Sequence, residues 1–267
     1  MTAIGGTRYP AVGQCIYCLS VDGLTDEHII PFGLSGTAVL PAASCRACAA
    51  LTSLVEERVL REESMRRVRA YRELRSRRKH RSAPAVGRLL VPDQNSGEVI
   101  ELPNDQYPTL LFMPRYPLPA VLAPDAYPGG DVQGILCYEP DKISFGPKPD
   151  EVMRGLGLTQ ATWASGRFHP AEFARMVAKI GYSYAVAARA WPLSFGLPAV
   201  VPAILGKRDD IGRWVGTAPG PNTSYEGALH RLDHYSWEWP RRVQVEVQLF
   251  ADSQTQTYLL VLDPEPD

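Results

Sequence analysis

The sequence predicts an α+β fold in which a small N-terminal module is followed by a basic helix and a larger α+β domain. Two Cys-x-x-Cys pairs lie near the start of the chain, and a basic run without glycine or proline follows them. Short alternating apolar segments fill much of the remainder, as strands of a second domain do. Because 267 residues suffice for two unequal domains, we place the module at residues 1–60, the basic helix and linker at 61–83 and the larger domain at 84–267.

The paired cysteines are Cys15/Cys18 and Cys45/Cys48. Two such knuckles offer four thiolates, which is the ligand set of a closed, tetrahedral structural Zn²⁺ site. The chain begins without a basic and apolar leader, and no apolar stretch is long enough to cross a membrane. We therefore expect a cytoplasmic protein without a membrane partner, in which paired cysteines indicate zinc rather than disulfides.

The segment between the two knuckles predicts a hairpin. Residues Leu24–Ile30 are expected to be extended and end at Pro31, and Gly33 and Gly36 offer turn positions before the second knuckle. After it, Ala49–Arg81 contains no glycine or proline and is predicted to be helical, with one break near Ser64.

Charge divides along the chain. Residues 1–83 carry 13 Lys/Arg and 8 Asp/Glu, a net charge of +5, while the remaining residues carry 15 and 21, a net charge of −6. A basic module beside an acidic one predicts that the first part contacts a polyanion. The bases that we expect to bind backbone phosphates lie on the predicted helix: Arg58, Arg61, Arg66, Arg69, Arg72, Arg75, Arg78 and Lys79.

The larger domain is predicted from periodicity alone. A helix with one apolar side is expected at Pro170–Arg189. The expected strands are Gly87–Val91, Glu98–Leu102, Leu110–Met113, Ala120–Ala123 and a closing hairpin of Val243–Ala251 with Thr257–Leu262. His230 and His234 stand four residues apart, the spacing of two side chains on one helix face, but no third ligand accompanies them.

Between the knuckles stands the string Glu27-His28-Ile29-Ile30-Pro31. Together with the four cysteines and the two glycines, over roughly residues 12–60, this string resembles the zinc-stabilised branch of the HNH endonuclease family. The resemblance implies a ββα-metal core in which a hairpin and the following helix hold a divalent ion against a scissile phosphate. It also implies a metal-dependent endonuclease that hydrolyses phosphodiester bonds in DNA, with RNA left open, and suggests an effector of bacterial restriction or anti-phage defence.

By this resemblance His28 is the general base and Glu27 is a ligand of a catalytic Mg²⁺ or Mn²⁺. Neighbouring residues of a regular strand point to opposite faces, so both can serve one site only where the strand bulges or ends. Asp26 is the competing ligand, because it shares a face with His28 in an undistorted strand.

The sequence departs from the family pattern at two places. Near Leu40 it lacks the asparagine that orients the base, and at Ala49, directly after the last cysteine, it lacks the asparagine or histidine that binds the catalytic metal. Either a neighbour such as Thr52, Ser53 or Glu56 substitutes, or the ion is held weakly, or the site is degenerate. The alternative function is therefore a catalytically degenerate zinc-knuckle module that binds nucleic acid or a protein. In both readings residues 84–267 are candidates for binding a protein partner or for homo-oligomerisation.

Overall fold

The computed structural model describes residues 2–3, 6–74, 86–91, 98–103, 105–123, 125, 127, 133–163, 168–237 and 242–264. The helices are α1 (Arg46–Arg61), α2 (Glu63–Tyr71), α3 (Pro149–Gly155), α4 (Pro170–Ala187) and α5 (Val201–Ile204). The strands are β1 (Thr2–Ala3), β2 (Leu24–His28), β3 (Val39–Cys45), β4 (Val86–Val91), β5 (Glu98–Pro103), β6 (Thr109–Arg115), β7 (Tyr138–Phe145), β8 (Thr162–Trp163), β9 (Val215–Thr217), β10 (His230–Trp237), β11 (Arg242–Leu249) and β12 (Tyr258–Leu262). Among these described residues no helix combines the length and apolarity that crossing a membrane requires. The predicted α+β class is confirmed.

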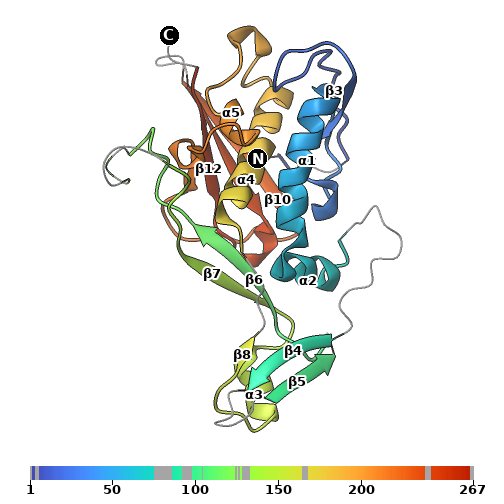
Figure 1. Ribbon diagram of the computed structural model, residues 1–267, viewed down its shortest axis with the longest axis vertical. Helices are drawn as coiled ribbons and strands as arrows, with labels where there is room; N and C mark the ends of the chain where they lie inside the picture. Colours follow the sequence, from blue (N-terminus) through green and yellow to red (C-terminus); the bar gives the residue numbers. More distant parts are fainter. Residues whose placement is uncertain are drawn as a thin grey trace.

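The largest sheet has the strand order β1-β10-β11-β12-β9, with every neighbouring pair antiparallel. The predicted closing hairpin is the β11–β12 pair, with Val245 opposite Leu260. His230 and His234 lie on strand β10. The sequence does not predict this strand, because a spacing of four residues also fits one face of a helix. Helix α4 lies between this sheet and α1, so the N-terminal module rests on the sheet through α4 (Figure 1).

Helix α4 confirms the helix predicted from Pro170, but both of its sides are buried. Gly181 faces the sheet, and a Cβ there would lie 2.8 Å from Cδ2 of Leu260. Lys179, two residues earlier, lies about 200° away around the helix and faces α1. A helix buried all round packs between two layers, and one hydrophobic core accordingly includes residues of the module, of α4 and of the sheet.

The module consists of the predicted hairpin, β2 with β3, and helix α1. The register of the hairpin shifts between Thr25 and Glu27, and just after this irregularity Glu27 and His28 both line one pocket. The basic helix breaks at Glu62, close to the predicted position, where the carboxylate accepts a hydrogen bond of 2.8 Å from the backbone N–H of His169. The predicted domain limit at Ser82–Pro84 lies outside the described residues.

A smaller lobe stands apart from the main sheet (Figure 1). It contains the sheet β5-β4-β8 and helix α3, and the ribbon β6–β7 connects it to the main body. The strands predicted at residues 87–91, 98–102 and 110–113 are confirmed as β4, β5 and β6. The strand predicted at Ala120–Ala123 is wrong: these residues form a turn in which the N–H groups of Leu122 and Ala123 donate to the carbonyl of Pro119.

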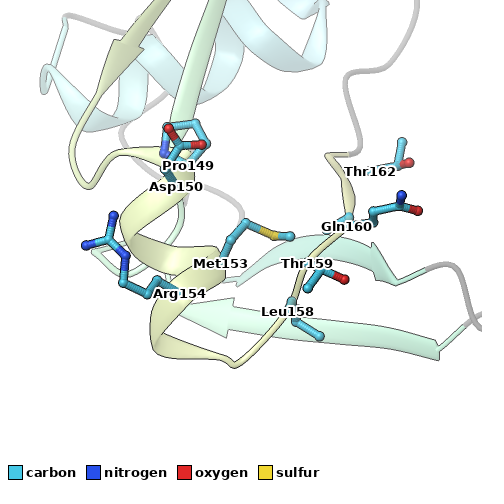
Figure 2. A pocket seen from close by; sticks show the side chains of 9 residues that line it. Pro149, Asp150, Met153, Arg154, Leu158, Thr159, Gln160 and Thr162 are labelled. Atoms are coloured by element: carbon cyan, nitrogen blue, oxygen red, sulfur yellow. The ribbon is translucent and has the colours of Figure 1, made fainter.

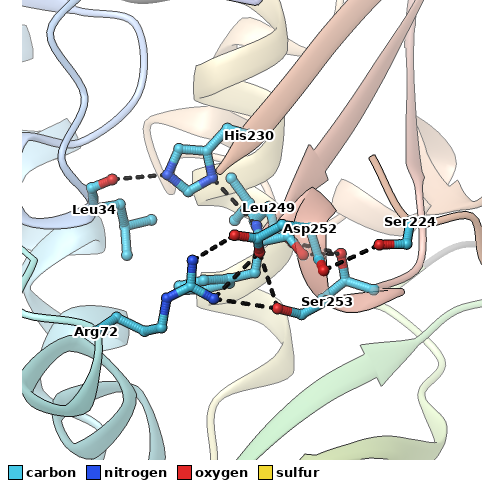
Figure 3. Close-up of polar contacts among 9 residues, drawn as sticks. Leu34, Arg72, Ser224, His230, Leu249, Asp252 and Ser253 are labelled. Atoms are coloured by element: carbon cyan, nitrogen blue, oxygen red, sulfur yellow. Dashed lines mark hydrogen bonds and ion pairs between the residues drawn. The ribbon is translucent and has the colours of Figure 1, made fainter. Parts of the chain in front are cut away.

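Two polar contacts connect the N-terminal part of the chain, at Leu34 and Arg72, with His230 of the sheet and with Asp252 just after β11 (Figure 3). Nε2 of His230 lies 2.7 Å from the carbonyl of Leu34, and Nδ1 accepts from the backbone N–H of Phe250 at 3.3 Å. Because Nδ1 accepts, the imidazole is neutral and donates through Nε2. Beside it, Arg72 pairs with Asp252. Burial lowers the pKa of His230 to about 4, against the opposing effect of the Leu34 carbonyl.

This lowered pKa predicts a loss of stability in acid. The folded protein holds His230 neutral, so its contribution is complete above the ordinary pKa of about 6.5 and is lost as the pH falls through about 4. The shift corresponds to about 3 kcal/mol. Urea unfolding of wild type and His230→Gln at several pH values between these limits measures it. The wild type is expected to lose more stability than the variant, and parallel losses would contradict the prediction.

Candidate functional site

The four paired cysteines converge on one point. Their sulfur atoms all lie within 4.8 Å of one another, and the Sγ atoms of Cys18 and Cys45 are 3.7 Å apart. In a tetrahedral site with Zn–S bonds of about 2.3 Å the sulfur atoms are about 3.8 Å apart. The residues therefore fit a structural zinc ion held by Cys15, Cys18, Cys45 and Cys48.

Local backbone geometry brings the two knuckles together. In the first, Leu19 adopts a left-handed conformation and its N–H donates to the carbonyl of Cys15 at 2.8 Å. In the second, Cys45 ends β3 and caps α1, and its Sγ accepts from the backbone N–H of Cys48 at 3.5 Å. This hydrogen bond lowers the pKa of Cys45 to about 7. The thiolate form of Cys45, which is the form that zinc binds, is thus favoured at the start of α1.

Next to the zinc cluster the expected catalytic residues line one pocket of about 450 Å³. Asp26, Glu27 and His28 come from the end of β2, and the opposite wall is α1. Ala49, the apolar replacement of an expected metal ligand, is part of that wall. The further lining residues are Phe32, Gly33, Thr52, Ser53, Glu56, Glu57, Leu60, Arg61, Arg69 and Lys179. The structure therefore brings the sequence-predicted triplet of residues 26–28 to one cavity.

Lys179 of α4 enters this pocket from the larger domain. Its ammonium group lies 2.5 Å from Oε1 of Glu27 and 2.9 Å from Oε1 of Glu56, and it also donates to the carbonyl oxygen of His28. The side chains of Lys179 and Glu27 are only 3% and 6% exposed, and that of Glu56 is 20% exposed. A buried cation thus connects the end of β2 with α1.

The charges of this cluster follow from its burial. Burial acts to lower the pKa of Lys179, but the carboxylates of Glu27 and Glu56 outweigh it and raise that pKa above its ordinary value. The ammonium group therefore stays protonated at neutral pH. Burial raises the pKa of Glu27, and the adjacent Lys179 opposes this effect.

Asp26 and His28 differ from Glu27 in exposure. Asp26 is 44% exposed, pairs with Arg8 at 3.0 Å and accepts a hydrogen bond of 3.3 Å from the backbone N–H of Ala42. The imidazole of His28 is partly exposed and packs edge-on against Phe32, with ring centroids 5.9 Å apart. His28 therefore presents its ring to the pocket while its backbone is held by Lys179.

The residues present do not fit the expected catalytic Mg²⁺ or Mn²⁺. Glu27 and Glu56 are engaged by an ammonium group, and Ala49 has no donor atom. The hydroxyl of Thr52 donates to the carbonyls of Cys48 and Ala49, within 3.3 Å of each. Among the residues that the structure describes, the four cysteines are the only group of three or more metal-ligating side chains.

The predicted phosphate-binding bases fall into three groups. Arg58, Arg61 and Arg66 are exposed; Arg58 pairs with Glu172 at 3.0 Å and Arg61 pairs with Glu57. Arg69 and Arg72 instead make internal contacts: Arg69 donates to the carbonyls of Gly33 and Leu60, and Arg72 pairs with Asp252. Arg75, Arg78 and Lys79 lie outside the described residues.

Lys179 was missed by the sequence prediction, although the sequence contains a signal. It is the only charged residue between Met176 and Ala187, in a stretch that is otherwise apolar or small. Lysine is almost never fully buried unless it is paired. A single lysine in a helix buried all round therefore indicates an acidic partner.

A larger hollow of about 660 Å³ lies in the small lobe, between α3 and the segment before β8 (Figure 2). Its lining residues include Asp150, Met153 and Arg154 of α3 and Leu158, Thr159, Gln160 and Thr162; Met153 extends toward Gln160, whereas Arg154 extends away from it. It contains none of the residues that the sequence predicts for the site.

The candidate site thus combines four convergent cysteines with a pocket that Glu27 and His28 of the bulged hairpin and residues of α1 line. Comparisons of the chain with protein-family models, curated proteins and solved structures found no match.

Proposed function

We propose that this chain hydrolyses phosphodiester bonds in DNA, with His28 as the general base of a zinc-stabilised HNH-like site. One observation carries the proposal: His28, Glu27 and Asp26 line a single pocket between the bulged hairpin and α1, beside the cysteine cluster. A partly exposed imidazole can accept a proton near neutral pH, which a base in hydrolysis must do. The zinc ion would hold the hairpin and the helix together and takes no part in the reaction.

The reaction assigned to the pocket is water attack on phosphorus. His28 takes one proton from the attacking water as the new P–O bond forms. The bond from phosphorus to the leaving oxygen then breaks, and that oxygen takes a proton from solvent. The exposed guanidinium of Arg61 on the pocket wall favours the negative charge of the phosphate.

DNA is proposed to approach along the exposed face of α1 and α2. Arg58, Arg61 and Arg66 present their side chains there. The pair of Arg61 with Glu57 is exposed on both sides, so its exchange for backbone phosphates costs little. Arg58 is itself exposed, while its partner Glu172 is 18% exposed. Such contacts give affinity without sequence choice and weaken as salt rises.

The test is nicking of supercoiled plasmid by the zinc-loaded full chain. His28→Ala is expected to lower the rate by at least about 100-fold, because proton transfer by a positioned base contributes that much. His234→Ala is the matched control, since this half-buried histidine on β10 lies outside the pocket. Equal rates for wild type and His28→Ala would refute the assignment of the base.

The second candidate function is a zinc-knuckle module that binds nucleic acid or a protein without cutting. Ala49 and the pairing of Glu27 with Lys179 favour it, because both remove ligands that a catalytic ion would need. In that case plasmid is bound in a salt-dependent manner, yet wild type and His28→Ala are both inactive in nicking. A protein partner or self-association through residues 84–267, and a role in bacterial defence, are further proposals of the same kind.

A further inference from the structure

The ammonium group of Lys179 has no donor left for a substrate. A lysine side chain carries three N–H donors and no acceptor. In this site the three acceptors are Oε1 of Glu27, Oε1 of Glu56 and the carbonyl oxygen of His28. Because the side chain is only 3% exposed, solvent and ligands have almost no access to it. Lys179 therefore acts on the site through the groups that it holds.

These three acceptors are also what a divalent cation requires. Mg²⁺ and Mn²⁺ favour oxygen ligands, and carboxylates and backbone carbonyls are common among them. Two carboxylates and a carbonyl converge here from β2 and α1, and a single positive charge already lies among them. A second cation at these oxygens would lie within a few ångströms of the ammonium group. The two charges would repel each other strongly, because buried charges are screened little by water.

We propose that Lys179 is the resident cation of the HNH-like site: it occupies the place where Glu27 would hold a divalent ion, and it positions His28 through the backbone carbonyl. This inference rests on the proposed function for its catalytic meaning and departs from the metal dependence that the family resemblance implies. Lys179 is thus a positioning residue. Its removal converts the Glu27–Glu56 pair into a divalent-cation site.

Contacts of helix α4 on both of its sides fix the position of Lys179. Tyr182, three residues after Lys179, donates to the carbonyl of Ile16 in the first knuckle at 2.6 Å. Gly181 fixes the distance of the same helix to the sheet. The position of the ammonium group is therefore set from both sides, by the zinc module and by the sheet.

The test measures binding of Mn²⁺ to the zinc-loaded full chain by electron paramagnetic resonance and calorimetry. Wild type is expected to show no Mn²⁺ binding at Glu27 in the titration. Lys179→Met is expected to bind one equivalent of Mn²⁺, with an affinity at least about 100-fold above any that wild type could have, because the repelling charge is gone. Glu27→Gln added to Lys179→Met is expected to abolish that binding. Arg175→Met, on the same helix and paired with the exposed Asp209, is expected to behave as wild type.

Two results overturn the proposal. One is a Mn²⁺ ion bound to wild type and lost in Glu27→Gln, since Lys179 would then not exclude a cation. The other is a folded Lys179→Met that gains no Mn²⁺ signal. If Lys179→Met folds poorly, Lys179→Gln keeps a hydrogen-bond donor without the charge and is judged by the same criterion.

The metal-binding result is independent of cleavage. Failure of the proposed function appears as plasmid that stays intact, while the Mn²⁺ titrations still decide the role of Lys179. Failure of this inference appears as Mn²⁺ that binds wild type and is lost in Glu27→Gln, or as a folded Lys179→Met without a Mn²⁺ signal, whatever the plasmid shows. A lysine with only a structural role would leave the Mn²⁺ spectrum of every variant unchanged.

Discussion

A Cys48→Ser variant is expected to lose its zinc and, with it, the folded structure of the N-terminal module. Cys48 is one of four cysteines whose sulfur atoms lie within 4.8 Å of one another. The backbone N–H of Ile16 also donates to the carbonyl of Ala43 at 2.8 Å and so joins the first knuckle to β3, but a structural zinc ion contributes roughly 10–16 kcal/mol to small domains that depend on it. Serine does not replace a thiolate ligand, so the effect is the largest that we predict for one substitution.

Zinc content by mass spectrometry and urea unfolding followed by circular dichroism measure this loss. The matched control is Cys137→Ser, because Cys137 is exposed and lies outside the cluster. The control is expected to keep one zinc per chain and the stability of wild type. A Cys48→Ser protein that retains stoichiometric zinc and unfolds like wild type would show that the cluster is not the metal site.

Lys179→Met is expected to lower the free energy of unfolding by about 3–5 kcal/mol when no divalent cation is present. The substitution keeps much of the side-chain volume but leaves Glu27 and Glu56 facing each other without a counter-charge. Buried charges that lose their partner are costly because they can regain neither water nor a compensating ion. The loss of stability therefore arises mainly at Glu27, the more buried of the two carboxylates.

Urea midpoints of wild type, Lys179→Met and Lys179→Met with Glu27→Gln measure this cost. The added Glu27→Gln removes one of the two unpaired charges and is expected to restore part of the stability. Arg175→Met is the control for replacing a cation on α4; because its partner Asp209 is 71% exposed, we expect a loss below about 1 kcal/mol. Equal losses of stability for the two methionine variants would show that the burial of the Lys179 pairs does not determine the loss.

The zinc module was predictable because its signals are close together in the sequence. Cysteine spacing, the glycines of the hairpin and the string around His28 all act within fifty residues. Cys45 even performs two local tasks, since it ends β3 and caps α1. An irregular strand is the geometric condition for placing Glu27 and His28 at one pocket, and the register shift lies between Thr25 and Glu27.

The contacts that complete the site were not predictable from local pattern. Lys179 is 151 residues from His28, and only the packing of α4 against α1 brings them together. Two members of the basic run are a related case: Arg69 and Arg72 find acceptors at Gly33 and Asp252, so their charge serves the fold. The histidines of β10 suggested a helix because a spacing of four fits a helix face as well as alternate positions of one strand face.

The position of α4 has a consequence for how this architecture can be inherited or engineered. A module defined by closely spaced sequence motifs suggests a portable unit that could be joined to any body. Here the cation that completes its pocket and the tyrosine that holds its first knuckle both belong to α4, and α4 also covers the sheet. If the module were grafted onto another body, Glu27 and Glu56 would lack the cation that now pairs with them, so module and body must change together.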